Sequence, residues 1–293
     1  MPSPEFENLV QMFKAQRTDA RPEIGELRTA FDMLGSMMPV ADGVTTEVTK
    51  LGGMTAERHS PEGAPDDRII LYLHGGGYCI GTCDSHRPVT TAIAKASGIA
   101  VIVPEYRLAP EHPFPAAVED ARAAYEDLLA EGYDAKKIVV SGESAGGGLT
   151  FALLLSLHDD GRPLPACAAP LSPWVDMSGL GDVSDAALEL DFLRPEAIAL
   201  FAASYVPDGV VAPLNSPVSA DLSGLPPMLI QGGEREILID MIRRVAAQAK
   251  DCGVDVTLEV DPGMFHAWHL FSVLPEAQDA IARVARFANE HLA

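Results

Sequence analysis

The stretch "KIVVSGESAGGG" (137–148) places a serine among glycines directly after an apolar run. The apolar residues of 137–142 predict a buried strand, and the pattern of 145–157 predicts a helix, so Ser144 falls at the turn between them. The spacing matches neither the Gly-x-x-x-x-Gly-Lys-Ser/Thr phosphate loop nor the Gly-x-Gly-x-x-Gly dinucleotide turn. Two interpretations remain. One is a plain turn, and the other is a nucleophile elbow in which Gly142 and Gly146 allow strand and helix to approach closely.

Strand and helix patterns alternate from about residue 68 onward. Short apolar runs predict strands at 68–74, 99–106, 137–142, 227–233 and 254–260. Helical patterns with one apolar face occupy 116–132, 238–253 and 275–292. This alternation predicts an α/β fold, with a largely parallel sheet covered by helices on both faces.

Two regions interrupt the alternation. Residues 1–40 carry two amphipathic helical patterns with no strand between them, and the Ala-rich segment 176–212 is also helical in pattern. We expect the two regions to pack together as a cap. The predicted division is cap helices in 1–45, a core in 46–177, a cap insertion in 178–212 and the rest of the core in 213–293.

Charge and composition exclude several classes of protein. Lys and Arg number 21 against 42 Asp and Glu, and the net charge of −21 disfavours binding to nucleic acid or anionic lipid. No apolar run is long enough for a membrane span, and "MPSPEFENLVQMFKAQR" lacks the pattern of a signal peptide. The four scattered cysteines suit a reducing compartment, so we expect a cytoplasmic protein. They are Cys79, Cys83, Cys167 and Cys252.

A second glycine-rich turn follows the strand predicted at 68–74. "LYLHGGGYCIG" places His74 and three glycines at the end of this strand, where backbone N–H groups can turn inward. An HGGG loop of this kind supplies oxyanion donors in lipases and esterases, together with the N–H of the residue after the nucleophile, which is Ala145 here. A glycine-rich turn is also found as plain structure, but its combination with the Ser144 turn favours the oxyanion interpretation.

Five motifs in order resemble the bacterial hormone-sensitive-lipase-like family of α/β-hydrolase esterases. They are "HGGG" (74–77), "YRLAPEHPFPAA" (106–117), "GESAGG" (142–147), "SPWVD" (172–176) and "MFHAWH" (264–269). The resemblance implies an α/β-hydrolase fold with an eight-stranded, mostly parallel sheet and a helical cap. It also implies that Gly76, Gly77 and Ala145 are the oxyanion donors, that His74 is structural, and that the chain pairs as a homodimer through the sheet edge near 254–260.

The base and the acid are sought after Ser144, because in this fold the nucleophile, acid and base follow in that order. His266 and His269 lie after the last predicted strand, and the family pattern selects His266. The strand at 227–233 is followed by Glu234, Glu236 and Asp240. The family frame, an acid two residues before Leu and four before Asp, selects Glu236; Glu234 remains the alternative, and Asp240 fits the start of a helix.

The remaining titratable residues of the motifs are interpreted as structural. We expect Glu143 to be a solvated or salt-bridged carboxylate rather than a catalytic one, and His86 to be structural. His112 is also interpreted as structural. His59, His158 and His291 are interpreted as surface residues.

These features together predict a carboxylic ester hydrolase for short- to medium-chain acyl esters. Ser144 is the predicted nucleophile, His266 the base and Glu236 the acid, and the reaction passes through an acyl-enzyme. An amidase or deacetylase and an acyltransferase use the same machinery and remain alternatives, and a noncatalytic small-molecule receptor is a further one. The prediction includes a small-molecule ester as substrate, and no cofactor and no metal.

Overall fold

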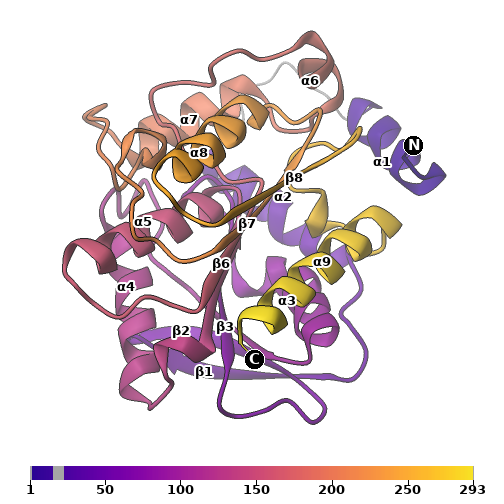
Figure 1. Cartoon of the computed structure of the whole chain (residues 1–293). Helices are drawn as coiled ribbons and strands as arrows, with labels where there is room; N and C mark the ends of the chain where they lie inside the picture. Colours follow the sequence, from indigo (N-terminus) through magenta and orange to yellow (C-terminus); the bar gives the residue numbers. More distant parts are fainter. Residues whose placement is uncertain (1, 16–22, 293) are drawn as a thin grey trace.

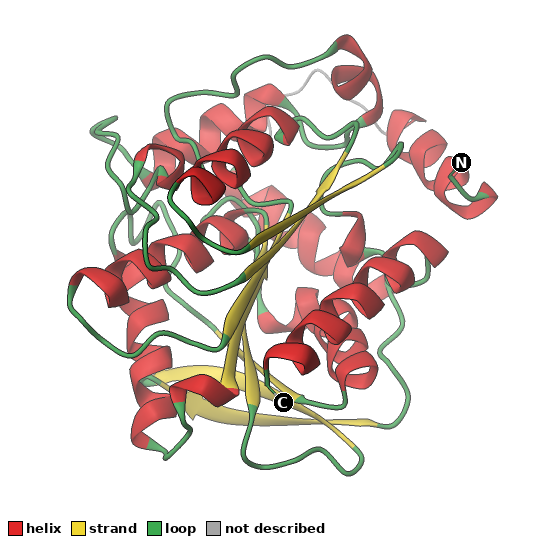
Figure 2. Ribbon diagram, in the orientation of Figure 1, coloured by secondary structure: helices red, strands yellow, loops and turns green. Residues whose placement is uncertain are grey.

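The computed structural model of the chain describes residues 2–15 and 23–292. A single eight-stranded sheet passes through the middle of the molecule, with helices on both of its faces (Figure 1 and Figure 2). The strands are β1 (Val44–Leu51), β2 (Met54–Pro61), β3 (Ile69–Leu73), β4 (Ala100–Pro104), β5 (Ile138–Glu143), β6 (Cys167–Leu171), β7 (Met228–Gly233) and β8 (Val256–Asp261). Their order across the sheet is β1-β2-β4-β3-β5-β6-β7-β8.

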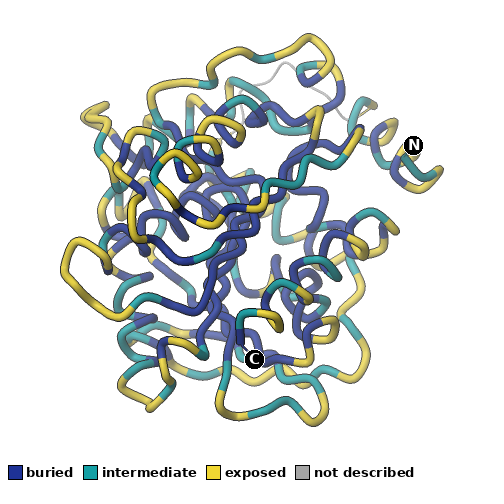
Figure 3. The backbone as a smooth tube through the Cα atoms, viewed as in Figure 1, coloured by how far each residue is buried: buried dark blue, intermediate teal, exposed yellow. Residues whose placement is uncertain are grey.

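The sheet is mostly parallel, as predicted. Strand β2 pairs antiparallel with both β1 and β4, and every other neighbouring pair is parallel. The central strands β3 to β7 are mostly apolar and fully buried, because helices cover both of their faces (Figure 3). The chain is therefore an α/β-hydrolase in fold.

The helices divide between the two faces of the sheet. They are α1 (Pro4–Ala15), α2 (Ile24–Met37), α3 (Cys83–Ser97), α4 (Ala116–Ala130), α5 (Ala145–Asp159), α6 (Asp185–Leu190), α7 (Pro195–Tyr205), α8 (Ile239–Asp251) and α9 (Pro275–His291). Short 3-10 turns occur at Ala135–Lys137, Pro217–Ser219 and Trp268–Leu270. Figure 1 shows α3 and α9 together on one face and α4, α5 and α8 on the other.

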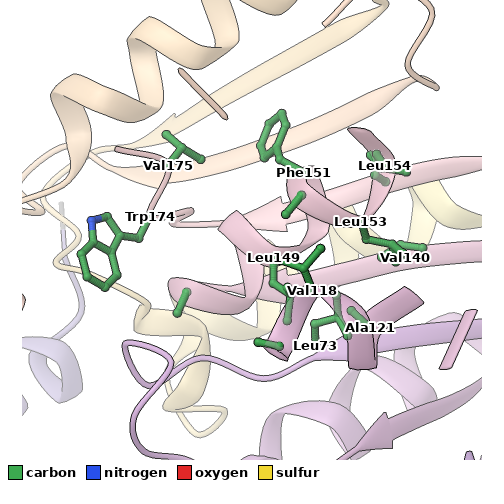
Figure 4. Close-up of a cluster of buried hydrophobic side chains, with 14 of the residues drawn as sticks. Leu73, Val118, Ala121, Val140, Leu149, Phe151, Leu153, Leu154, Trp174 and Val175 are labelled. Carbon is green, nitrogen blue, oxygen red and sulfur yellow. The ribbon is translucent and has the colours of Figure 1, made fainter. Parts of the chain in front are cut away.

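The alternation of side chains along the strands builds one core on each face. In β3, Leu71 and Leu73 belong to the core under α4, α5 and α8, whereas Ile70 and Tyr72 belong to the core under α3 and α9. Helix α5 lies at the centre of the larger core and is buried along nearly its whole length, so it has no broad polar face (Figure 4). This burial holds the residue before α5, which is Ser144, in a fixed position.

The strands predicted from apolar runs are present, with ends within two residues of the predicted ones in most cases. The sequence pattern did not single out β1 and β2, which are polar and partly exposed, as strands at an edge of the sheet are. It also missed α3, where Pro88 and several Ser and Thr residues interrupt the apolar face. Core contacts, rather than local preference, stabilise this helix.

The two regions predicted to form a cap are helical and contact each other. Residues 1–45 carry α1 and α2, and residues 178–212 carry α6 and α7; residues 16–22 of the first region lie outside the described part of the chain. The ring of Phe13 in α1 lies 5.2 Å from that of Phe192, measured between centroids. The division of the chain into cap and core remains a prediction.

Candidate active site

Ser144 lies at a sharp turn between β5 and α5. Its backbone has φ 55° and ψ −120°, which is an unfavourable conformation for a residue other than glycine. A Cβ atom added to Gly142 or Gly146 would overlap the carbonyl oxygen of Leu73. Glycine at these positions lets α5 approach β3 closely, and this matches the nucleophile elbow rather than a plain turn.

His266 reaches the Ser144 side chain from the loop after β8. Its Nε2 atom lies 2.8 Å from the Oγ atom of Ser144, and both side chains are almost completely buried. The next residue, Ala267, has φ 49°, and its N–H donates a hydrogen bond to the Ser172 hydroxyl at 3.1 Å. Ser172 lies just beyond β6, so the loop of His266 is attached to the end of β6, which pairs with β5.

Of the three carboxylates considered from the sequence, the structure brings Glu236 to His266. The Glu236 Oε2 atom lies 3.4 Å from His266 Nδ1. Glu234 instead accepts a hydrogen bond from the N–H of Gly263, and Asp240 lies 3.7 Å from Arg244. A separation of 3.4 Å is long for a hydrogen bond, and such contacts often tighten only when substrate is bound.

The pKa of His266 is set by competing effects. Burial lowers the pKa, but the adjacent carboxylate of Glu236 and the charge of Asp191 outweigh burial, so the pKa is raised above the usual 6.5. Asp191 was not among the residues predicted from the sequence; it is fully buried in the segment 178–212. No local motif marks this residue, and only the folded chain brings it near His266.

The glycines predicted as oxyanion donors lie in a tightly packed loop. Gly76 and Gly77 have φ values of 106° and 61°. A Cβ atom on Gly76 would overlap the carbonyl of Ile80, and one on Gly77 would overlap the ring of Phe201 in α7. Ala145 is the first residue of α5, so its N–H has no acceptor within the helix. Each of the three positions therefore provides a backbone N–H, and the two glycines have no side chain that would block close approach.

Glu143 is buried and paired with His86, so of the two interpretations offered for it, solvated or salt-bridged, the salt-bridged one is confirmed. Its Oε1 atom accepts hydrogen bonds from the N–H of Gly75 at 2.6 Å and from His86 Nε2 at 2.8 Å. Its Oε2 atom accepts one from the Tyr72 hydroxyl at 2.6 Å. Burial raises the pKa of Glu143, but the charge of His86 and the hydrogen bonds lower it further, so the carboxylate stays ionised.

Three further buried histidines, apart from His266 and His86, are neutral. Burial lowers the pKa of His269 and of His74 to about 3, so neither is protonated at neutral pH. His269 Nε2 lies 3.0 Å from Gln231 Oε1, and His74 Nδ1 lies 2.9 Å from the carbonyl of Gly75. These contacts agree with structural roles. His59 is also buried, with a pKa lowered to about 4, so its interpretation as a surface residue was wrong.

Residues from the two N-terminal helices contact the segments that flank the site. The rings of Phe6 and Phe13 in α1 lie 4.8 Å and 5.8 Å from that of Phe265, which precedes His266. Arg28 in α2 donates hydrogen bonds to the carbonyls of Cys79 and Ala109, close to the glycine loop. Helices far away in the sequence therefore hold both the histidine loop and the glycine loop.

The arrangement suits acyl transfer. A serine hydroxyl beside an imidazole, a carboxylate behind the imidazole and a loop of glycine N–H groups are the parts that nucleophilic attack on a carbonyl requires.

Among residues 2–15 and 23–292 there is no cluster of side chains suited to hold a metal ion. No helix within the same residues is long and apolar enough to cross a membrane. Fold and site geometry together define a hydrolase of the α/β-hydrolase class.

Comparisons with known proteins identify the family. A family model described as alpha/beta hydrolase fold matches residues 70–270. An acetyl-hydrolase of Streptomyces hygroscopicus is 39% identical over 98% of this chain and 97% of its own, and an esterase of Acinetobacter venetianus is 32% identical over 89% and 88%. A solved esterase of the bacterial hormone-sensitive lipase family is 42% identical, with a TM-score of 0.95 over 100% of both chains. The solved structure of EstE5, soaked with p-nitrophenyl butyrate, is 38% identical, with a TM-score of 0.93 over 99% of both chains.

The chain therefore belongs to the bacterial hormone-sensitive-lipase family of α/β-hydrolases. Its relatives include proteins named acetyl-hydrolase, esterase and carboxylesterase, a structural neighbour is an esterase, and the protein is a carboxylesterase.

Proposed function

We propose that this carboxylesterase cleaves short- to medium-chain acyl esters through an acyl-enzyme formed on Ser144. His266 is the general base in this proposal, and Glu236 is the carboxylate that orients it. The observation that carries the proposal is the alignment of the three side chains: 2.8 Å from Ser144 Oγ to His266 Nε2, and 3.4 Å from His266 Nδ1 to Glu236 Oε2. The strained backbone at Ser144 supports the same assignment, because it presents the hydroxyl at the end of β5.

The reaction begins with the transfer of the Ser144 hydroxyl proton to His266 Nε2 as the oxygen attacks the ester carbonyl. The N–H groups of Gly76, Gly77 and Ala145 stabilise the negative oxygen of the tetrahedral intermediate. His266 then returns the proton to the leaving alcohol. Water attacks the acyl-enzyme with His266 again as base, and the carboxylic acid is released with Ser144 restored.

Two observations support a preference for short acyl groups. The ring of Phe201 occupies the space that a side chain at position 77 would need. It therefore leaves little room beside Gly77, a proposed oxyanion donor. One relative is named an acetyl-hydrolase, and one structural neighbour was soaked with the ester of a four-carbon acid. In this proposal residues 1–45 and 178–212 form the cap that encloses the substrate.

A series of p-nitrophenyl esters of increasing acyl length tests the proposal. We expect the wild-type chain to hydrolyse the acetate and butyrate, with kcat/KM falling for long chains, and Ser144→Ala to lose nearly all activity while keeping its fold. Ser36→Ala, which changes an exposed serine on α2, is the matched control. A folded and fully active Ser144→Ala variant would refute the proposal.

Trapping of the intermediate tests the chemical step. An organophosphate should add to one serine and abolish activity, and peptide mass spectrometry should place the adduct on Ser144. Matched anilide substrates and added acceptor alcohols in the same assay compare ester hydrolysis with amide hydrolysis and acyl transfer. An adduct on a different serine would show that the nucleophile is wrongly assigned.

We further propose that the protein acts in the cytoplasm as a homodimer formed through β8. The last strand in the sheet order is β8, and its residues after Val256 are partly or fully exposed, so its edge is open to pairing. The four cysteines are free thiols, which suits a reducing compartment. Light scattering should give twice the chain mass of 31.1 kDa. The Thr257→Asp substitution should reduce the measured mass to that of a single chain.

A further inference from the structure

A buried carboxylate outside the proposed triad is bonded to the loop that carries the acid. Asp191 follows α6 and is 0% exposed. Its Oδ2 atom accepts a hydrogen bond from the backbone N–H of Ile237 at 2.8 Å, and its Oδ1 atom accepts one from the N–H of Leu193 at 3.1 Å. Ile237 directly follows Glu236, so a side chain from the segment 178–212 is attached to the acid loop.

The Glu236 side chain has little support of its own. In the part of the chain that the structure describes, no donor makes a well-aligned hydrogen bond with its carboxylate, and His266 Nδ1 lies 3.4 Å away. Its backbone N–H donates to the carbonyl of Gly233 at 3.2 Å. The direction of the carboxylate therefore depends on the position of the backbone at 236 and 237, which the contact with Asp191 helps to hold.

Asp191 also acts electrostatically on His266. The acidic groups that influence His266 are Glu236, Asp191 and, more weakly, Glu143, and their charges favour the imidazolium. Burial and, to a smaller extent, Glu236 raise the pKa of Asp191, whereas His266 and the two N–H donors lower it; the result is about 6. Asp191 is therefore largely ionised at neutral pH and adds a negative charge near the proposed base.

We propose that Asp191 is a positioning residue for the Glu236–His266 pair, because it holds the acid loop at Ile237 and adds a second buried negative charge near His266. This inference rests on the triad proposed above. It gives the segment 178–212 a task besides covering the substrate, since this segment supplies a group that supports the proposed base. Asp191 does not exchange a proton with Ser144 and does not replace Glu236.

Asp191→Asn separates charge from shape. Asn is nearly the same size, but it is neutral. Its amide NH₂ would face one of the two N–H groups from which the carboxylate accepts hydrogen bonds, so one of these bonds would be lost. Asp185→Asn is the matched control, because Asp185 is exposed at the start of α6 and its loss removes the same charge from the same segment. Asp191→Glu keeps the charge but shifts the oxygens, so it tests geometry alone.

The readout is the pH profile of kcat/KM for p-nitrophenyl butyrate, with thermal melting as the check on folding. We expect Asp191→Asn to lose about tenfold in kcat/KM. Its acid limb should move to lower pH, because His266 loses a negative charge that favours its protonated form. Asp191→Glu should keep an acid limb near that of the wild type, with a reduced rate, and it provides the test if Asp191→Asn fails to fold.

Three outcomes would overturn the inference. The first is an Asp191→Asn variant whose acid limb and kcat/KM equal those of Asp185→Asn. The second is full activity in Asp191→Glu. The third is a loss in Asp191→Asn of about a thousandfold while Glu236→Gln stays active, which would make Asp191 the acid itself. Ser144→Ala, assayed in parallel, reports on the proposed nucleophile independently of these variants.

Discussion

The Glu143 carboxylate and the backbone N–H of Gly75 are joined by a hydrogen bond of 2.6 Å. Glu143 directly precedes the proposed nucleophile, and Gly75 begins the glycine loop, so the bond connects the two parts that must align around an ester carbonyl. His86 and Tyr72 hold the carboxylate in place. A Cβ atom on Gly75 would overlap Glu143, and this explains why glycine is needed there.

Glu143→Gln should lower kcat with little change in KM. The substitution removes the charge that pairs with His86 and weakens the bond to Gly75, so the oxyanion donors lose alignment in the transition state. We expect a fall of about tenfold or more, less than the loss caused by deleting an oxyanion donor outright. Steady-state kinetics with p-nitrophenyl butyrate measures it, and Glu131→Gln, at an exposed position, is the control. An unchanged kcat would refute the role of the bond.

Glu236→Gln should lower kcat by roughly 10³ to 10⁴, because the neutral amide neither orients His266 correctly nor stabilises the imidazolium. The matched comparison is Glu234→Gln, two residues earlier in the same loop. Glu234 accepts a hydrogen bond from the N–H of Gly263, and the amide oxygen of glutamine can accept it too, so this variant should stay active. The reverse result would make Glu234 the acid.

The pH dependence should report the raised pKa of His266. Protonated imidazole cannot accept the Ser144 proton, so kcat/KM should fall about tenfold per pH unit below this pKa. Because Glu236 and Asp191 raise the pKa, the midpoint of the acid limb should lie above 6.5. A kcat/KM profile from about pH 5 to 8 measures it. A midpoint below 6.5, or no dependence on pH, contradicts the assignment of His266.

Gly146→Ala should destabilise the fold. The added methyl group would overlap the backbone carbonyl of Leu73, and backbone on both sides resists displacement. We expect a loss of about 3 kcal/mol in the free energy of unfolding, or roughly 10 °C in Tm. Gly25→Ala is the control, because no atom lies within 4 Å of a Cβ at that position of α2. Equal Tm values for the two variants would contradict the close approach of α5 to β3.

Local patterns predicted the central sheet well but not its edge. Buried parallel strands such as β3 and β5 are apolar on both faces, and a run of aliphatic residues is visible without any knowledge of the fold. Strands β1 and β2 alternate weakly; β1 pairs with β2, and β2 joins the pair to the rest of the sheet through β4. Both strands are largely polar and partly exposed, so no aliphatic run marks them in the sequence, which is why they were missed.

The candidate residues differ in how far the sequence could identify them. Ser144 and His266 lie in short motifs whose neighbouring glycines or turn residues mark their position. Glu236 needed the family frame, because three carboxylates follow β7 and the spacing alone does not separate them. Only the structure showed which of the three faces His266.

The sequence by itself determined the α/β order of elements, the glycines that permit the turn at Ser144, and the chain order of the proposed nucleophile, acid and base. The first two depend on neighbouring residues, and the third is simply the order of the motifs along the chain. Tertiary structure decided the roles of Glu143 and Asp191, whose partners His86 and Ile237 are distant in sequence. Burial and the charges of nearby groups set the pKa of a side chain, and both exist only once the chain has folded.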